Sequence, residues 1–168
     1  AIAEEFQPSC LMGTGQFCTN PGIVVLVAGE QTDAFVEAVS GRFDAAAVGT
    51  LLASGVESGM TASVKTLTSA GATLVTGGEA EAGEGFSYSN TLLTVTGQKF
   101  LADPETLQTE AFGNESLFVI AAELDEAVEI ARHFEGNLTG CVYSDTEGSD
   151  DAAYDRIAPL LRRKVGRL

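Results

Sequence analysis

Basic residues are scarce in this sequence. Nine Lys and Arg stand against 24 Asp and Glu, which gives a formal net charge of −15 over 168 residues. Such a surface repels phosphate groups, so we expect no nucleic-acid partner. The one basic cluster, at 162–164 and 167, is typical of a solvated helix end. Long hydrophobic runs are missing too: the longest, residues 23–28, has the length of a strand, which excludes a membrane span.

Cysteine and histidine are equally scarce. Cys10, Cys18 and Cys141 are an odd number without a Cys-x-x-Cys pair, and residues 1–5 do not resemble a secretion signal. This usage is typical of the reducing cytoplasm, where we expect the protein to reside. Because His133 is the only histidine, we expect no zinc or other metal site. The sequence lacks an initiator Met and stops directly after an expected helix, so we expect it to be part of a longer parent chain.

Hydrophobic residues make up 45% of the chain, enough for a buried core. β-Branched runs and residues at helical spacing alternate along it. This alternation predicts one α/β domain over 1–168, with a mostly parallel sheet covered by helices on both faces. The expected strands are 23–28, 72–76, 86–95, 117–122 and 138–143, and the expected helices are 33–47, 58–70, 103–110, 125–134 and 150–164. A further strand start is expected at Pro8 and Ser9, and Cys141 is expected to be buried within its strand.

The segment with the clearest chemical content is 13–22, Gly-Thr-Gly-Gln-Phe-Cys-Thr-Asn-Pro-Gly, directly before a buried strand. Gly13 and Gly15 permit unusual backbone angles and close approach. A cysteine presented on such a turn-rich loop is a candidate nucleophile, because a thiolate is the most nucleophilic side chain near neutral pH. The alternative is that Cys18 is a buried structural thiol. The Gly-x-Gly pattern is not a dinucleotide fingerprint, because no strand precedes it and Cys18 stands where the third Gly belongs.

Residues 15–22 resemble the active-site cysteine segment of the aldehyde dehydrogenase superfamily. About 90 residues later, 110–113 (Glu-Ala-Phe-Gly) resembles the Glu-x-Phe-Gly motif of that superfamily. The pattern after it also matches, through the strand at 117–122 to Asn-Leu-Thr-Gly at 137–140. The resemblance covers nearly the whole chain but only the later, catalytic-domain part of a longer enzyme. Within the superfamily, the Phe-Cys-Thr-Asn-Pro-Gly variant is most similar to the α-ketoglutarate semialdehyde (2,5-dioxopentanoate) dehydrogenases.

The resemblance implies a function and three site residues. Cys18 would attack a small-molecule aldehyde, and its own backbone N–H would stabilise the resulting oxyanion. Glu110 matches the residue that accepts hydrogen bonds from the nicotinamide ribose of NAD or NADP, and Phe112 matches the aromatic beside the nicotinamide ring. Asn114 stands where the family usually has Pro, which we expect to loosen the loop that carries Glu110.

The resemblance also implies parts that cannot be placed on these residues. The general-base glutamate, the asparagine that donates to the oxyanion, the dinucleotide-binding domain and the oligomerisation hairpin of the family have no counterpart here. We therefore expect a homo-oligomeric parent enzyme and an inactive isolated fragment. Two alternatives stay open: a cysteine hydrolase or acyltransferase with His133 as base and Gln16 as oxyanion donor, and a non-catalytic α/β module.

Overall fold

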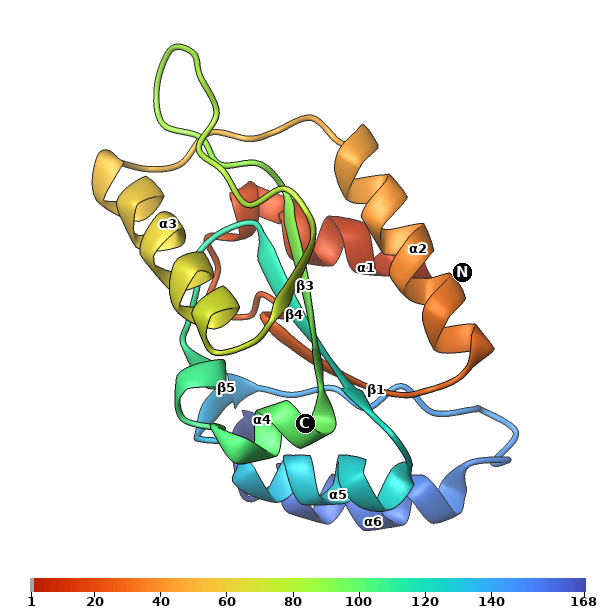
Figure 1. Cartoon of the computed structure of the whole chain (residues 1–168). Coiled ribbons are helices and arrows are strands. Elements are labelled where there is room, and N and C mark those ends of the chain that lie inside the picture. The colour runs from red at the N-terminus through yellow and green to blue at the C-terminus, as the bar shows by residue number, and fades with distance from the viewer. Residues whose placement is uncertain (1) are drawn as a thin grey trace.

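The chain is built around a four-stranded sheet, seen in a computed structural model that describes residues 2–168 (Figure 1). The strand order is β1 (Ile23–Val27), β4 (Glu115–Ala121), β3 (Thr91–Thr96) and β2 (Thr73–Thr76). β4 pairs in parallel with both β1 and β3, whereas the edge strand β2 is antiparallel to β3. β4 lies between two partners and is nearly wholly buried, which agrees with its almost uninterrupted apolar sequence.

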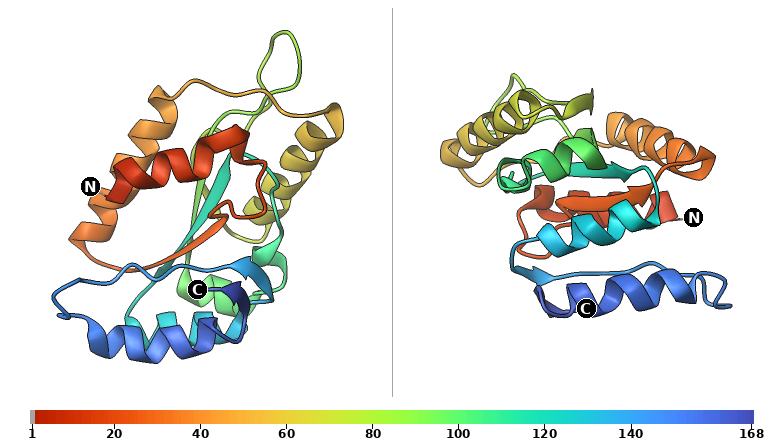
Figure 2. Two further views of the ribbon diagram at one scale, coloured as in Figure 1. Left: turned by 180° about the vertical axis from the view of Figure 1, so that it is seen from behind. Right: turned by 60° about the horizontal axis from the view of Figure 1, so that its bottom comes forward.

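Helices cover both faces of this sheet, as the alternating pattern predicts (Figure 2). α1 (Ile2–Leu11) and α2 (Glu30–Ala45) pack on one face, where Phe6, Phe43 and Phe118 share a cluster of aromatic rings. Along each strand, every second side chain points to the opposite face of the sheet. There they meet α3 (Ser54–Ser69), the short α4 (Gly97–Ala102) and α5 (Leu124–His133). The mostly parallel α/β architecture is thereby confirmed.

A smaller unit completes the described chain. α6 (Asp151–Leu161) packs on α5, and Pro159 lies inside it. β5 (Asn137–Thr139) and β6 (Val165–Arg167) form a separate two-stranded parallel sheet. No helix among residues 2–168 is long and apolar enough to cross a membrane.

The structure corrects several expected boundaries. The strand start at Pro8 and Ser9 is wrong, because both residues lie in α1; its first turn carries two glutamates, which suit a helix amino terminus. The helix expected at 103–110 is only a 3₁₀ turn, η2 (Thr106–Gln108), and α4 precedes it. Of the strand expected at 86–95, only the second half forms, as part of β3. Most of residues 86–90 lie in a loop.

The expectation for Cys141 is also wrong. β5 ends at Thr139, so Cys141 lies outside any strand, and its side chain is exposed. Its apolar neighbours do not form a buried strand there, since Leu138 and Tyr143 are exposed as well. Cys141 is therefore an accessible thiol rather than a core residue.

Phe118 in β4 is the central residue of the aromatic cluster. It is fully buried, stacks on Phe35 and meets Phe6 edge to face, with ring centroids 5.4 Å away in both cases. We expect Phe118→Ala to lower the free energy of unfolding by about 3–5 kcal/mol, because it leaves a cavity. Urea denaturation at pH 7 measures this. Phe86→Ala, which truncates a loop ring that is 40% exposed, is the control and should cost far less; equal losses would contradict the assigned core.

Candidate active site

The two motif segments meet because each precedes one of two neighbouring parallel strands. Residues 13–22 lead into β1 and residues 110–113 lead into β4. The β1–β4 register pairs Ile23 with Leu117, and the Leu117 N–H donates to the Gly22 carbonyl at 2.8 Å. Since parallel strands begin at the same edge of a sheet, this register places the cysteine segment beside the Glu-Ala-Phe-Gly segment.

Cys18 lies on a tight turn that follows a left-handed stretch of backbone. Gly13, Thr14 and Gly15 have φ values of +56°, +57° and +68°, a region that glycine adopts readily and threonine seldom does. The Asn20 N–H then donates to the Phe17 carbonyl at 3.0 Å and closes a turn with Cys18 near its centre. The Cys18 side chain is exposed, and its backbone N–H has no partner among residues 2–168. Sulfur and N–H are thus both available to a ligand.

The loop that carries Cys18 is in backbone contact with the second motif. A Cβ on Gly15 would lie 2.0 Å from the Gly113 oxygen, so no larger residue fits there. The Asn20 side-chain Nδ2 donates to that same oxygen at 2.8 Å. Further along, the Ser116 hydroxyl donates to the Pro21 carbonyl at 2.7 Å. The cysteine loop is therefore fixed at two points to Gly113 of the second motif and at a third point to β4.

Glu110 and Phe112 are exposed on the second loop, while Ala111 between them is buried against α3. The Ser63 hydroxyl donates to the Glu110 backbone carbonyl at 2.9 Å and ties this loop to α3. No described residue hydrogen-bonds the Glu110 carboxylate, and the Phe112 ring is 44% exposed. The loop thus presents an exposed hydrogen-bond acceptor and an exposed aromatic ring, which are compatible with a ribose diol and a nicotinamide ring.

The two residues that the hydrolase alternative requires, Gln16 and His133, both make hydrogen bonds to other parts of the chain. The Gln16 side chain accepts from the Leu52 N–H at 2.8 Å and donates to the Gly13 carbonyl at 2.9 Å, so it braces the loop. His133 ends α5, where its Nδ1 lies 2.9 Å from the Glu129 carbonyl of its own helix. No interaction joins His133 to Cys18 in the described chain. The structure does not bring a Cys–His pair together.

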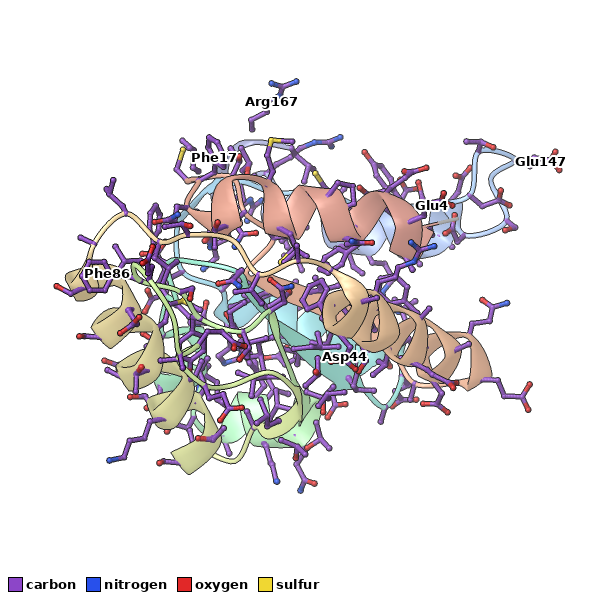
Figure 3. The ribbon with its side chains drawn as sticks, turned by 90° about the horizontal axis from the view of Figure 1, so that it is seen from above. Glu4, Phe17, Asp44, Phe86, Glu147 and Arg167 are labelled. Carbon is purple, nitrogen blue, oxygen red and sulfur yellow. The ribbon has the colours of Figure 1, made fainter. Side chains whose placement is uncertain are left out.

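A cavity of about 420 Å³ adjoins the Cys18 turn. It is lined at one side by Thr19, which follows Cys18, and elsewhere by Ser9, Cys141 and Arg167. Figure 3 shows Phe17 far from the acidic loop of Glu147, which lies at one end of the molecule. In the described part of the chain, no group of three or more His, Cys, Asp or Glu side chains could hold a metal ion.

A buried polar layer lies directly beneath the two motif loops. Asn114 is fully buried and donates to the Tyr88 carbonyl at 2.7 Å and to the Asn90 side chain at 2.8 Å. The expectation that Asn114 loosens the Glu110 loop is therefore wrong, because its amide ties the loop to the chain before β3. Cys10 is also buried, and burial together with the nearby Glu115 carboxyl raises the pKa of its thiol, which makes it unreactive.

Glu115 is the most unusual member of this layer. Its side chain is 2% exposed, and its Oε1 atom has no hydrogen-bond partner among residues 2–168. Burial raises the pKa of its carboxyl well above the ordinary value. The pKa of the Tyr88 hydroxyl is also raised, mainly because Tyr88 is itself removed from solvent and secondly because the Glu115 carboxyl is near. Glu115 therefore resists ionisation at the point where β4 begins.

Known proteins share both the sequence and this fold. A profile described as "Aldehyde dehydrogenase family" matches residues 1–158. The chain belongs to the aldehyde dehydrogenase family. Alpha-ketoglutaric semialdehyde dehydrogenase 2 of Azospirillum brasilense is 33% identical over 174 residues, covering all of this chain and 31% of that protein. This aldehyde dehydrogenase chain thus spans about a third of the length of that curated relative.

Solved aldehyde dehydrogenase structures confirm the fold. The NAD-dependent aldehyde dehydrogenase of Sinorhizobium meliloti superposes with a TM-score of 0.78 at 22% identity, over 99% of this chain and 33% of that one. The gamma-glutamyl-gamma-aminobutyraldehyde dehydrogenase of Burkholderia cenocepacia J2315 gives the same TM-score at 20% identity, over 98% and 33%.

Three residues around the candidate site have roles that were not expected from sequence. The Asn20–Gly113 hydrogen bond joins residues 93 positions apart, and nothing in the local sequence points to it. From its residue type alone, Glu115 would be assigned to the surface. Asn114 was expected to weaken the loop that carries Glu110. Their only signal is position, because both directly follow the second motif and precede the central strand.

The contact between the two motif loops predicts a glycine requirement. We expect Gly15→Ala to lower the free energy of unfolding by about 3 kcal/mol or more, because a Cβ would overlap backbone atoms of Gly113 at a positive φ. Gly22→Ala in the same segment is the control, since nothing lies within 4 Å of its added Cβ. Thermal and urea unfolding of the three proteins measure the effect, and equal stability of both variants would refute the close packing.

The raised pKa of Glu115 predicts a pH-dependent stability. Because its folded-state pKa exceeds the unfolded value, stability is fully present below the unfolded pKa and is lost as pH rises towards the folded pKa. Glu115→Gln removes this loss and should be more stable than the wild type by about 1–3 kcal/mol at pH 7.5, with little difference near pH 4. Urea midpoints at both pH values measure it. A constant difference between the two proteins across this range would contradict the assignment.

Proposed function

We propose that this chain carries the nucleophile of an NAD(P)-dependent aldehyde dehydrogenase, with Cys18 as the reacting residue. The observation that carries the proposal is the exposed Cys18 turn held against the Glu110–Phe112 loop by Gly15 and Asn20. A turn fixed at its base and open at its tip suits attack on a small carbonyl compound. Family membership supports the same assignment.

The chemistry begins with the Cys18 thiolate. Its sulfur forms a bond to the aldehyde carbon, and the carbonyl π electrons move to oxygen, where the unpaired Cys18 N–H can donate to the new oxyanion. NAD⁺ or NADP⁺, when bound, would accept the hydride that leaves this carbon as the C=O bond re-forms. Water would then add to the thioester carbon, and the C–S bond would break to give a carboxylate, two protons and the Cys18 thiolate again. Glu110 would accept from ribose hydroxyls, and Phe112 would pack at the ring.

For the substrate we propose α-ketoglutarate semialdehyde, oxidised to α-ketoglutarate. The Azospirillum relative with that name is the support from sequence. Polar residues, among them Ser9 and Thr19, line an open hollow beside the Cys18 turn. Hydroxyls there would suit the far carboxylate of such a substrate better than an alkyl chain.

The remaining parts of the enzyme are proposed to come from outside these residues. They are the dinucleotide-binding domain, the general-base glutamate, the asparagine that stabilises the oxyanion and the contacts of a homo-oligomer. We therefore propose residues 1–168 as one catalytic unit that does not turn over aldehyde alone. Three free cysteines suit a cytoplasmic enzyme.

The test uses this chain within a protein that also supplies the remaining two thirds found in its relatives. Cys18→Ser should lower aldehyde-dependent NAD(P)H formation at least about 1,000-fold, because a hydroxyl is a far weaker nucleophile than a thiolate. Cys141→Ser changes the other exposed thiol, which lines the cavity beside the turn, and should lower activity far less because Cys141 does not attack the aldehyde.

Three results would overturn parts of the proposal. Activity retained by Cys18→Ser would remove Cys18 as the nucleophile. Faster oxidation of pentanal than of α-ketoglutarate semialdehyde would remove the proposed substrate. NAD(P)H formation by purified residues 1–168 would show that the isolated chain is complete for catalysis.

A further inference from the structure

We propose that Asn20 is a positioning residue: its side-chain amide, donating to the Gly113 carbonyl, sets the orientation of the Cys18 turn relative to the second motif loop. This inference rests on the proposed function for its consequence in catalysis. The hydrogen bond itself concerns the geometry of the loop, so it can be tested without any aldehyde.

The turn has few other side-chain anchors. The side chains of Phe17, Cys18 and Thr19 are all exposed, so none of them fixes the turn by burial in the core. The Phe17 ring lies over Gly13 of the same loop, which cannot orient the loop as a whole. Gln16, before the turn, is also half-buried and bonds the Leu52 N–H, whereas Asn20 closes the turn itself and reaches across to the second motif, at 2.8 Å.

The acceptor at the other end is rigid. The Gly113 oxygen accepts from the Asn20 amide and also from the Glu115 N–H at 2.9 Å, which begins β4. A Cβ on Gly113 would lie 2.5 Å from the Met60 sulfur, so this peptide is packed against α3 as well. Because the Gly113 oxygen is held in place, the Asn20 amide that donates to it is held in place as well. The turn that contains Asn20, and therefore Cys18 two residues earlier, is oriented by this bond.

The hydrogen bonding of the Asn20 side chain indicates that it orients the Cys18 turn rather than stabilises the fold. Its Oδ1 atom is buried and has no hydrogen-bond partner in the described chain. An unpaired buried acceptor is costly, so an apolar residue of similar size could serve packing equally well. The amide supplies what an apolar residue cannot, a directed bond to Gly113. Removing the donor should therefore disturb the turn far more than the stability of the fold.

Asn20→Asp provides the test, because the new side chain can donate only when protonated. We expect hydrogen exchange of the backbone amides at position 20 and at Gly22, relative to the wild type, to be at least tenfold faster at pH 8. The ratio should return to within twofold as the pH falls to 4 and the carboxylic acid donates to Gly113. Asn137→Asp is the matched control, since the exposed Asn137 amide donates only to the nearby Glu135 carbonyl at 3.1 Å.

A second variant keeps the test valid if the carboxylate of Asn20→Asp unfolds the chain. Asn20→Leu removes the donor and the unpaired acceptor without adding charge. It should keep the wild-type urea midpoint and show fast exchange in the turn at every pH. Wild-type exchange in Asn20→Leu, or an exchange ratio for Asn20→Asp that does not change with pH, would overturn the proposal.

The catalytic consequence is measured separately, in the longer protein used to test the function. There Asn20→Asp should lower kcat about 100-fold at pH 8 and leave KM within threefold, since a displaced nucleophile slows the chemical step. An unchanged kcat alongside fast exchange would remove Asn20 from the positioning of Cys18. If the wild type itself oxidises no aldehyde, the proposed function fails, while the exchange ratios still decide the role of the Asn20–Gly113 bond.

Discussion

The close approach of two backbone segments, at Gly15 and Gly113, is the constraint on which the site depends. The parallel pairing of β1 with β4 brings the segments to one edge of the sheet, and only glycine allows the remaining approach. The left-handed backbone from Gly13 to Gly15 then turns the chain so that the next residues project outwards. The exposure of Cys18 follows from this packing, because the turn is held at its base and has nothing packed over its tip.

The layer beneath the loops is polar, which is an unusual foundation for a rigid site. The side-chain amides of Asn114 and Asn90 donate to backbone carbonyls around them, whereas Asn114 Oδ1 and Glu115 Oε1 are buried without a hydrogen-bond partner among residues 2–168. Buried amides with well-placed partners fix a single geometry, while an unpaired acceptor lowers stability. The fold thus combines precise placement of the two loops with a local energetic cost. The aromatic cluster around Phe118 on the neighbouring face offsets such costs through ordinary apolar packing.

Much of this arrangement could be predicted from sequence, and the failures have physical reasons. The strands β1 and β4 were predictable from their short continuous apolar runs, although only β4 is buried, whereas β1 is partly exposed. The two motifs were recognisable because residues 15–22 and 110–113 resemble two segments of the aldehyde dehydrogenase family in the same order. Cys141 was misplaced because its apolar neighbours describe only the local chain, whereas burial depends on what packs against it. The Asn20 bond was invisible because its partner lies in a distant segment that only the strand register brings near.

The central claim is that the Cys18 turn is fixed to the second motif through one shared carbonyl oxygen. The most direct measurement is the nuclear Overhauser effect between the Asn20 side-chain amide protons and the Glu115 backbone amide proton. Both groups donate to the Gly113 oxygen, so their protons should lie within about 4 Å of each other. The account predicts a strong cross-peak and slow exchange of the Asn20 side-chain protons. No cross-peak, with side-chain protons that exchange as fast as those of Asn137, would contradict it.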